Sequence, residues 1–108
     1  MNVNELIEKT GWTLVCGDGT REIHGGCCGD LLSRVMGNGP AGSAWITVQA
    51  HRNVIAIASL REFACVIFAD GVRPDDALID LATQEGVTLV VSPLSVYETA
   101  KAMAAAGI

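Results

Sequence analysis

The stretch Cys65–Val91, CVIFADGVRPDDALIDLATQEGVTLVV, contains a strand, a helix and a second strand in one continuous unit. The apolar run Cys65–Ala69 is typical of a strand that is covered on both faces. A turn breaks the run, and a helix follows with Pro74 in its first turn and acidic residues at its positive end, until Gly86 closes it. Val87–Val91 is the next strand. This order of elements predicts a parallel sheet.

Strand and helix alternate in the same way from residue 44 to the end of the sequence, and shorter elements precede them. The expected strands are Trp12–Cys16, Arg21–His24, Ala44–Gln49, Cys65–Ala69 and Val87–Val91. The expected helices begin at Asn2, Asp30, Asn53, Pro74 and Ser95, and they end at Gly11, Gly37, Phe63, Gly86 and about Ala106. The sequence therefore predicts one compact α/β domain over residues 1–108. It should have a mostly parallel sheet of about four or five strands, with helices on both faces.

Composition and charge exclude several classes of function. The 108 residues carry a net charge of −5 and contain no run of basic residues, so nucleic-acid binding is disfavoured. No apolar run reaches the length of a membrane span, and the first residues lack the basic start and apolar stretch of a signal peptide. We expect a cytoplasmic protein that binds neither nucleic acid nor membrane.

Four cysteines, Cys16, Cys27, Cys28 and Cys65, are expected to be free thiols in a reducing compartment. Cys27 and Cys28, with Cys16 and His24, are candidate zinc ligands, but the usual Cys-x-x-Cys spacing is missing and adjacent cysteines point in different directions. Buried structural thiols are the favoured interpretation. A metal- or thiol-based enzyme is the least favoured function, and we expect no metal and no cofactor.

Motifs for phosphate chemistry are missing from the sequence. No Gly-Lys pair occurs, which disfavours P-loop ATP hydrolysis or kinase activity. Residues 37–42 match Gly-x-Gly-x-x-Gly, but they contain Pro40 and lead into a strand instead of a helix. His24 and His51 have no Ser or Cys nucleophile with an acidic partner in their local sequence. The sequence therefore predicts a non-catalytic protein.

Polar, glycine-rich loops follow four of the expected strands. These loops are Gly25–Asp30, Gln49–His51, Asp70-Gly71 and Ser92–Ser95. If the strands are parallel, the loops share one rim of the sheet, where ligands of open α/β folds bind and where helix N-termini can hold an anion such as phosphate. The same glycines and caps would also serve ordinary βα turns, which is the structural alternative. The candidate ligand-binding residues are Arg21, Gly25, Gly26, Asp30, Thr47, Gln49, His51, Asn53, Asp70, Gly71 and Ser92.

Taken together, these residues resemble the DRTGG domain over roughly residues 2 to 107, and most closely its stand-alone bacterial members. Those members are similar to the N-terminal domain of HPr serine kinase. The resemblance rests on Arg21, Gly25-Gly26, Asp30–Ser33, Val35-Met36, Trp45-Ile46-Thr47, Gln49, His51, Asn53, Val54, Ala56, Ala58, Gly71, Pro74-Asp75 and Ser95. The signature itself is altered, because the matching place reads Glu22-Ile-His24-Gly25-Gly26, and Cys27-Cys28 follows it.

The resemblance implies an α/β domain that often forms homodimers. Relatives occur attached to phosphotransacetylases and to regulatory pyrophosphatases, where they accompany modules that sense adenine nucleotides. It does not imply kinase activity, since the P-loop is missing. The favoured function is a regulatory or ligand-sensing module that binds a nucleotide or phosphorylated metabolite at the rim. The alternative is a homodimeric protein-interaction module that partners a larger redox or kinase system.

Overall fold

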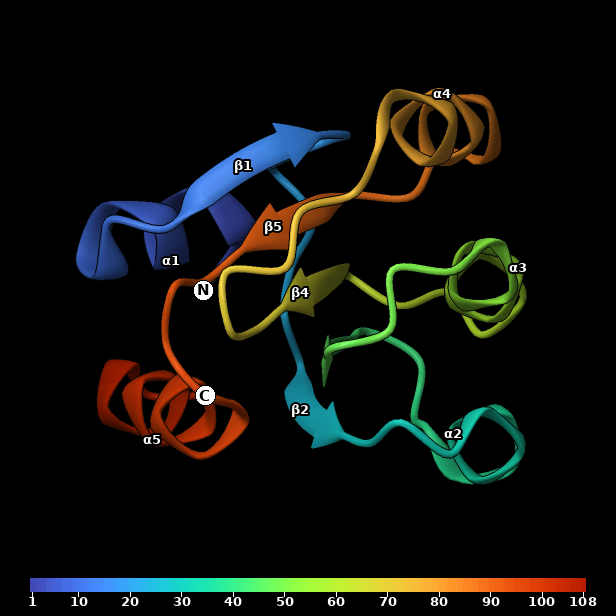
Figure 1. Ribbon diagram of the computed structural model, residues 1–108. Helices are drawn as coiled ribbons and strands as arrows, with labels where there is room; N and C mark the ends of the chain where they lie inside the picture. The colour runs from blue at the N-terminus through green and yellow to red at the C-terminus, as the bar shows by residue number, and fades with distance from the viewer.

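A five-stranded sheet forms the centre of the computed structural model, which describes residues 1–108 (Figure 1). Its strands are β1 (Thr13–Cys16), β2 (Gly25–Cys28), β3 (Ser43–Thr47), β4 (Cys65–Phe68) and β5 (Leu89–Val91), in the spatial order β1-β5-β4-β3-β2. Strands β2 to β5 are parallel, and β1 pairs antiparallel with β5 at one edge. The mostly parallel α/β sheet predicted from the sequence is confirmed.

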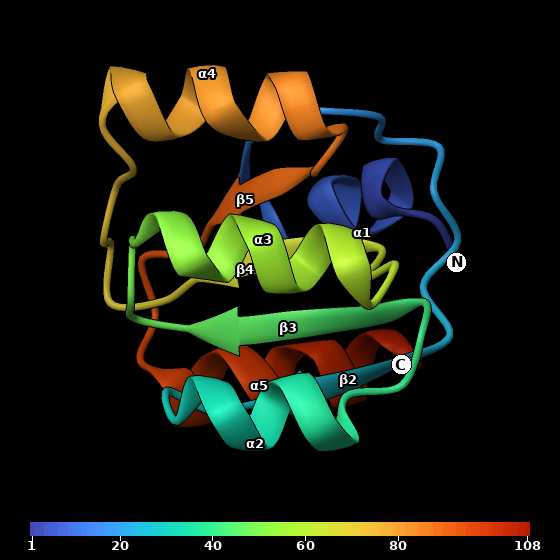
Figure 2. The ribbon, with the colours of Figure 1, turned by 90° about the vertical axis from the view of Figure 1, so that its right-hand side faces the viewer.

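Helices cover both faces of the sheet, as expected (Figures 1 and 2). One face carries α2 (Leu32–Asn38), α3 (Arg52–Leu60) and α4 (Asp76–Glu85), and the other carries α1 (Val3–Thr10) and α5 (Val96–Ala106). Side chains alternate along β4, because Cys65 and Ile67 join the cluster under α1 and α5 while Val66 and Phe68 join the cluster under the other three helices. None of the helices is long and apolar enough to cross a membrane.

Local capping chemistry explains where most helices start and stop. Asn2 accepts a hydrogen bond from the backbone N–H of Glu5, whose side chain bonds back, so the predicted capping box is present. Asp75 caps α4 and Ser95 caps α5 by accepting the N–H three residues on. Gly86 ends α4 with a left-handed φ of 69°, a conformation that glycine adopts without strain.

The second strand differs from the prediction. Arg21–His24 is not a strand, and β2 instead begins at the glycine pair, with Gly25 aligned with Ser43 and Gly26 with Ala44. A Cβ atom at Gly26 would lie 2.9 Å from Met103 Cε of α5, so a larger residue there would require the flexible end of the Met103 side chain to shift. Intrinsic propensity disfavours glycine in strands, which is why the sequence pattern placed the strand too early.

The predicted start of α2 is also wrong. Asp30 does not cap this helix, whose N-cap is Leu31 with no side-chain hydrogen bond, and the helix ends at Asn38 instead of Gly37. Helix α3 ends at Leu60, three residues before the predicted end at Phe63. Most strand boundaries move by one or two residues, as is usual for element ends.

Candidate functional site

The carboxyl ends of β2 to β5 lie at one edge of the sheet, because these strands are parallel. Predicted site residues follow each strand there: Asp30 after β2, Gln49 and His51 after β3, Asp70 after β4, and Ser92 after β5. The structure thus brings together on one rim the loops that were expected to share it. What each residue does there depends on its hydrogen bonds.

Asp30 fastens the end of β2 to the end of β3. Its Oδ1 accepts a hydrogen bond from Thr47 Oγ1 at 2.6 Å and another from the backbone N–H of Val48 at 2.9 Å. The Thr47 side chain is fully buried, so its hydroxyl has no access to water as an alternative partner. Asp30 and Thr47 are therefore structural elements of the rim.

Replacing Asp30 with alanine should lower the free energy of unfolding by about 1–3 kcal/mol, because a buried hydroxyl and an amide lose their acceptor. Urea unfolding followed by circular dichroism measures the loss. In a Thr47→Val background the same replacement should cost less, by at least about 0.5 kcal/mol, since one of the two donors is already gone. Strictly additive effects of the two substitutions would show that Asp30 does not act through Thr47.

The β4 and β5 loops hold each other in place. Asp70 and Gly71 both have left-handed φ, at 57° and 67°, and Val72 N–H donates to the carbonyl of Ala69 at 3.1 Å, as in a type I′ turn. Asp70 N–H also donates to the Leu94 carbonyl at 2.7 Å, and Gly71 N–H donates to the Ser92 carbonyl at 2.9 Å. These amides are therefore engaged within the protein.

Ser92 is fully buried, and its hydroxyl lies 2.9 Å from the Thr99 hydroxyl of α5. It also accepts a hydrogen bond from Leu94 N–H at 3.2 Å. Both contacts anchor the start of α5 to the end of β5. Ligand binding by Asp70, Gly71 and Ser92 stays a prediction. The backbone N–H groups of Asp70 and Gly71 and the hydroxyl of Ser92 already form hydrogen bonds within the protein.

Three predicted site residues lie away from the rim. Gly25 and Gly26 form the first half of β2, at the amino ends of the parallel strands. Arg21 Nη1 donates to the carbonyl of Phe63 at 2.9 Å, just before β4 begins. The expectation that the glycine pair belongs to a rim loop is wrong, because the pair opens a strand instead of following one.

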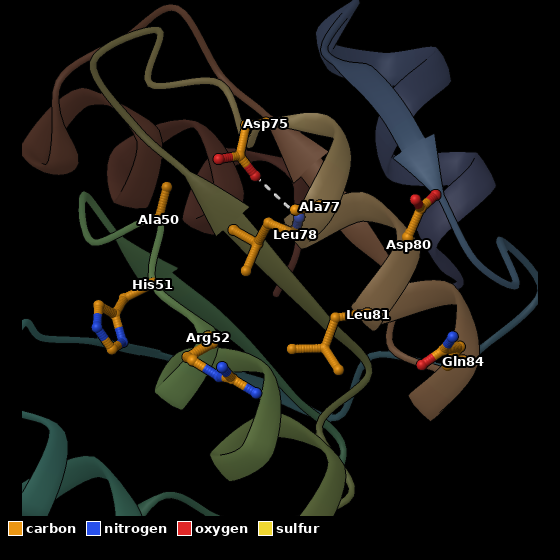
Figure 3. A pocket seen from close by; sticks show the side chains of 9 residues that line it. All are labelled: Ala50, His51, Arg52, Asp75, Ala77, Leu78, Asp80, Leu81 and Gln84. Atoms are coloured by element: carbon orange, nitrogen blue, oxygen red, sulfur yellow. Dashed lines mark hydrogen bonds between the residues drawn. The ribbon is translucent and has the colours of Figure 1, made fainter.

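The largest cleft lies beside the rim, between the N-terminal ends of α3 and α4, and measures about 580 Å³ (Figure 3). Figure 3 shows His51 and Arg52 on the α3 side and Leu78 and Leu81 facing them from α4, while Asp80 points away. The lining residues are Ala50, His51, Arg52, Asp75, Ala77, Leu78, Asp80, Leu81 and Gln84. The cleft thus combines an apolar floor with charged groups at its sides.

Two of the polar groups in the cleft already have partners. His51 Nδ1 accepts the backbone N–H of Asn53 at 3.1 Å and so caps α3, and Asp75 Oδ1 accepts the N–H of Leu78 at 2.9 Å. Arg52 is exposed and takes part in no ion pair, since the structure's ion pair joins the N-terminal amine to Glu22. Its guanidinium is therefore available to an incoming anion.

Sequence reasoning missed Arg52, Leu81 and Gln84 as cleft residues. Leu78 and Leu81 have the helical spacing of core positions, yet Leu81 is only half-buried and partly lines the cleft. One sequence feature could have indicated the cleft: Arg52 is a lone basic residue between His51 and Asn53, which were both candidate site residues.

All four cysteines are free thiols, but only Cys65 is buried as expected, since Cys16 and Cys27 are half-buried and Cys28 is exposed. Burial raises the pKa of the Cys27 thiol to about 11, and the neighbouring Cys28 adds to the shift. Burial also raises the pKa of Cys28, with Asp30 contributing, and raises the pKa of the fully buried Cys65 to about 12 although Arg21 opposes the shift. These three thiols are protonated at neutral pH and are weak nucleophiles. No three His, Cys, Asp or Glu side chains gather in a way that could hold a metal ion.

No protein-family model matches the sequence, and no curated protein matches it either. A solved structure does match: the CBS and DRTGG domains of the regulatory region of Clostridium perfringens pyrophosphatase, complexed with the activator diadenosine tetraphosphate. The TM-score is 0.74 at 11% sequence identity, over 94% of this chain and 45% of that chain. This chain thus spans less than half of the matched chain. The likeness shows a shared fold with part of that regulatory region, and it supports the DRTGG-like fold expected from the sequence.

Proposed function

We propose that this chain is a non-catalytic regulatory module of the DRTGG type, and that it binds a small anionic ligand in the cleft between α3 and α4. The ligand class is a nucleotide or a phosphorylated metabolite. The observation that carries the proposal is the cleft itself, in which an unpaired Arg52 lies beside two helix N-termini and faces an apolar wall. The matched pyrophosphatase regulatory region, which is complexed with a nucleotide activator, supports the nucleotide class.

The physical chemistry of the cleft suits such a ligand. Its volume of about 580 Å³ lies within the usual range of roughly 300–1,000 Å³ for small-molecule sites. The positive end of the α3 dipole favours an anion, whereas the Asp75 carboxylate already occupies that of α4, and the guanidinium of Arg52 can hold two phosphate oxygens at once. Leu78 and Leu81 offer an apolar surface on which a planar base can rest.

The acidic residues of the cleft narrow the choice of ligand. Asp75 and Asp80 both line the cleft that holds Arg52, although the Asp80 carboxylate points away from its centre, so two acidic side chains accompany one basic side chain. A long polyphosphate would be repelled by these carboxylates more strongly than a single phosphate group would. A nucleoside monophosphate is therefore the favoured ligand, with its phosphate at Arg52 and its base against α4.

Thermal unfolding with AMP, ATP, diadenosine tetraphosphate and inorganic phosphate at millimolar concentration tests this function. AMP should stabilise the protein by about 2.7 kcal/mol at a concentration about 100-fold above its Kd. Arg52→Ala should remove most of this gain. Lys101→Ala is the matched control, because it deletes an exposed cation on α5, across the sheet, and should leave the gain unchanged. The absence of stabilisation by every ligand, or an equal gain in Arg52→Ala, would contradict the proposal.

The alternative function is a homodimeric interaction module, and three large apolar side chains are exposed at the surface. Leu31, Leu60 and Tyr97 are 65%, 68% and 70% exposed. They do not form one patch, because Leu31 precedes α2 and Leu60 ends α3 on one face of the sheet, while Tyr97 belongs to α5 on the other face. Light scattering at micromolar concentration decides the oligomeric state, and a monomeric mass would count against the dimer.

A further inference from the structure

Strand β2 forms an open edge of the sheet. It pairs only with β3, and Gly29 N–H just beyond it donates to the Ile46 carbonyl at 3.1 Å. Because main-chain groups alternate in direction along a strand, the N–H and C=O groups of Gly26 and Cys28 point to the unpaired side. Both residues are exposed. The outward main-chain groups of this edge are therefore accessible to another strand.

This edge is short, at four residues, but it lacks the charges, prolines and bulges that usually block strand addition. Residues Gly25–Cys28 include no charged residue and no proline, and the glycine pair has no side chain to keep another backbone away. The opposite edge, β1, is different, since a register shift between Leu14 and Cys16 interrupts its pairing with β5. Both β1 and β2 are edge strands, and β2 is the one whose pairing with its neighbour is regular.

A hollow flanks β2 on each face of the sheet. On the α5 side, about 190 Å³ is lined mainly by apolar groups, among them Ile46, Ala100, Met103 and Ala104. On the α2 side, about 200 Å³ is lined by polar and apolar groups, among them Arg34. Successive side chains of an added strand point to opposite faces, so they would enter the two hollows alternately.

The two hollows differ in the chemistry that they accept. The α5 hollow suits a valine-sized apolar side chain. In the α2 hollow Arg34 is exposed and in no ion pair, and the acid that shares the hollow, Asp30, is held away from it by hydrogen bonds from Thr47 and Val48 instead of pairing with it. This arrangement favours a carboxylate that can pair with Arg34.

We propose that β2 binds an extended segment of a partner protein by strand addition. The segment has an apolar residue directed to the α5 hollow, next to an acidic residue directed to Arg34. Main-chain hydrogen bonds to Gly26 and Cys28 supply affinity, and the two hollows supply specificity. This surface is separate from the cleft between α3 and α4, so the proposal does not depend on the ligand proposed there.

Amide NMR of the ¹⁵N-labelled protein tests the proposal with a synthetic pentapeptide that alternates valine with glutamate. The Gly26 and Cys28 amides should shift on titration and become protected from hydrogen exchange. Arg34→Glu, or a peptide with lysine in place of glutamate, should weaken binding by about tenfold, through loss and reversal of the ion pair. A peptide N-methylated on the face that meets β2 should not bind, because it cannot donate to the edge.

Two further variants test whether the peptide binds at β2 and not elsewhere. Cys28→Lys places a charge beside the edge and should abolish peptide binding, while Arg52→Ala, in the other cleft, should leave it unchanged. Shifts that map outside β2, equal binding of the N-methylated peptide, or no binding at millimolar concentration would overturn the proposal. Concentration-dependent shifts at Gly26 and Cys28 without any peptide would also overturn it, because they would show that a second copy of this chain occupies the edge.

Discussion

Trp45→Ala should destabilise the protein by about 3–5 kcal/mol, a large share of the stability of a domain of this size. Trp45 is fully buried in the centre of β3, and its ring meets Phe63 edge-on with a centroid distance of 5.7 Å and an interplanar angle of 72°. Its Nε1–H donates to the Gly29 carbonyl at 2.9 Å. The substitution removes core volume, an aromatic contact and the hydrogen bond that ties the rim loop to β3.

Urea unfolding followed by far-ultraviolet circular dichroism measures this effect without relying on the deleted fluorophore. Trp45→Phe should lose less than Trp45→Ala, because a ring still fills the core while the Gly29 carbonyl loses its donor. Tyr97→Ala is the matched control, since Tyr97 is 70% exposed and its loss should change stability by no more than about 0.5 kcal/mol. A Trp45→Ala cost below about 1 kcal/mol would contradict the packing described for β3.

Gly39→Ala is the second substitution with a large expected effect, about 1–3 kcal/mol or more of destabilisation from overpacking. A Cβ atom at position 39 would collide with the Phe63 ring and lie 2.9 Å from the Val35 carbonyl oxygen. Phe63 is buried, so it has no room to move aside. The Gly39 carbonyl also accepts a hydrogen bond from Arg61 Nε at 3.0 Å, which holds this turn against α3.

Gly37→Ala is the control, two residues away, and should have the opposite sign. Gly37 lies within α2, and a Cβ atom added there would meet no other atom within 4 Å. Alanine at this position should therefore stabilise the helix by about 0.5–1 kcal/mol. Thermal melting of both variants resolves the difference, because about 1 kcal/mol moves the Tm of such a domain by roughly 4–8 °C. Equal shifts in the same direction would show that Gly39 is not confined by Phe63.

Local chemistry made much of the fold predictable. The unit from Cys65 to Val91 folds as a strand, a helix and a strand, as expected, because an apolar run and a closing glycine act locally. The helix start differs, since Asp75 caps α4 and Pro74 lies before the helix instead of in its first turn. The capping box at Asn2 and the cap at Ser95 are equally local. Where side-chain chemistry and backbone preference agree within one turn, sequence alone sets the element.

The errors lie where distant segments decide the outcome. Gly25 and Gly26 form a strand because β3 pairs with them and Met103 packs closely over the second glycine, contacts that no local pattern encodes. Asp30 has the usual position of a helix cap, yet its carboxylate instead accepts a hydrogen bond from the buried Thr47 hydroxyl, 17 residues away. Tertiary hydrogen bonds therefore overrode the local expectation.

The candidate site was only partly predictable for the same reason. Parallel strands place their loops on one rim, so the general region followed from topology. The cleft, however, forms where α3 and α4 pack side by side, and its walls combine Arg52 with leucines from a helix much further along the chain. The packing of α3 against α4 therefore determines which residues line the cleft, and the sequence pattern does not specify this packing.

An amide NMR titration of the protein with AMP tests the central claim most directly. We predict saturable shifts concentrated at residues 50–54 and 75–78, where α3 and α4 begin, and their loss in Arg52→Ala but not in Lys101→Ala. Saturable shifts elsewhere in the chain, or none at millimolar AMP, would contradict the assignment of the cleft as the ligand site.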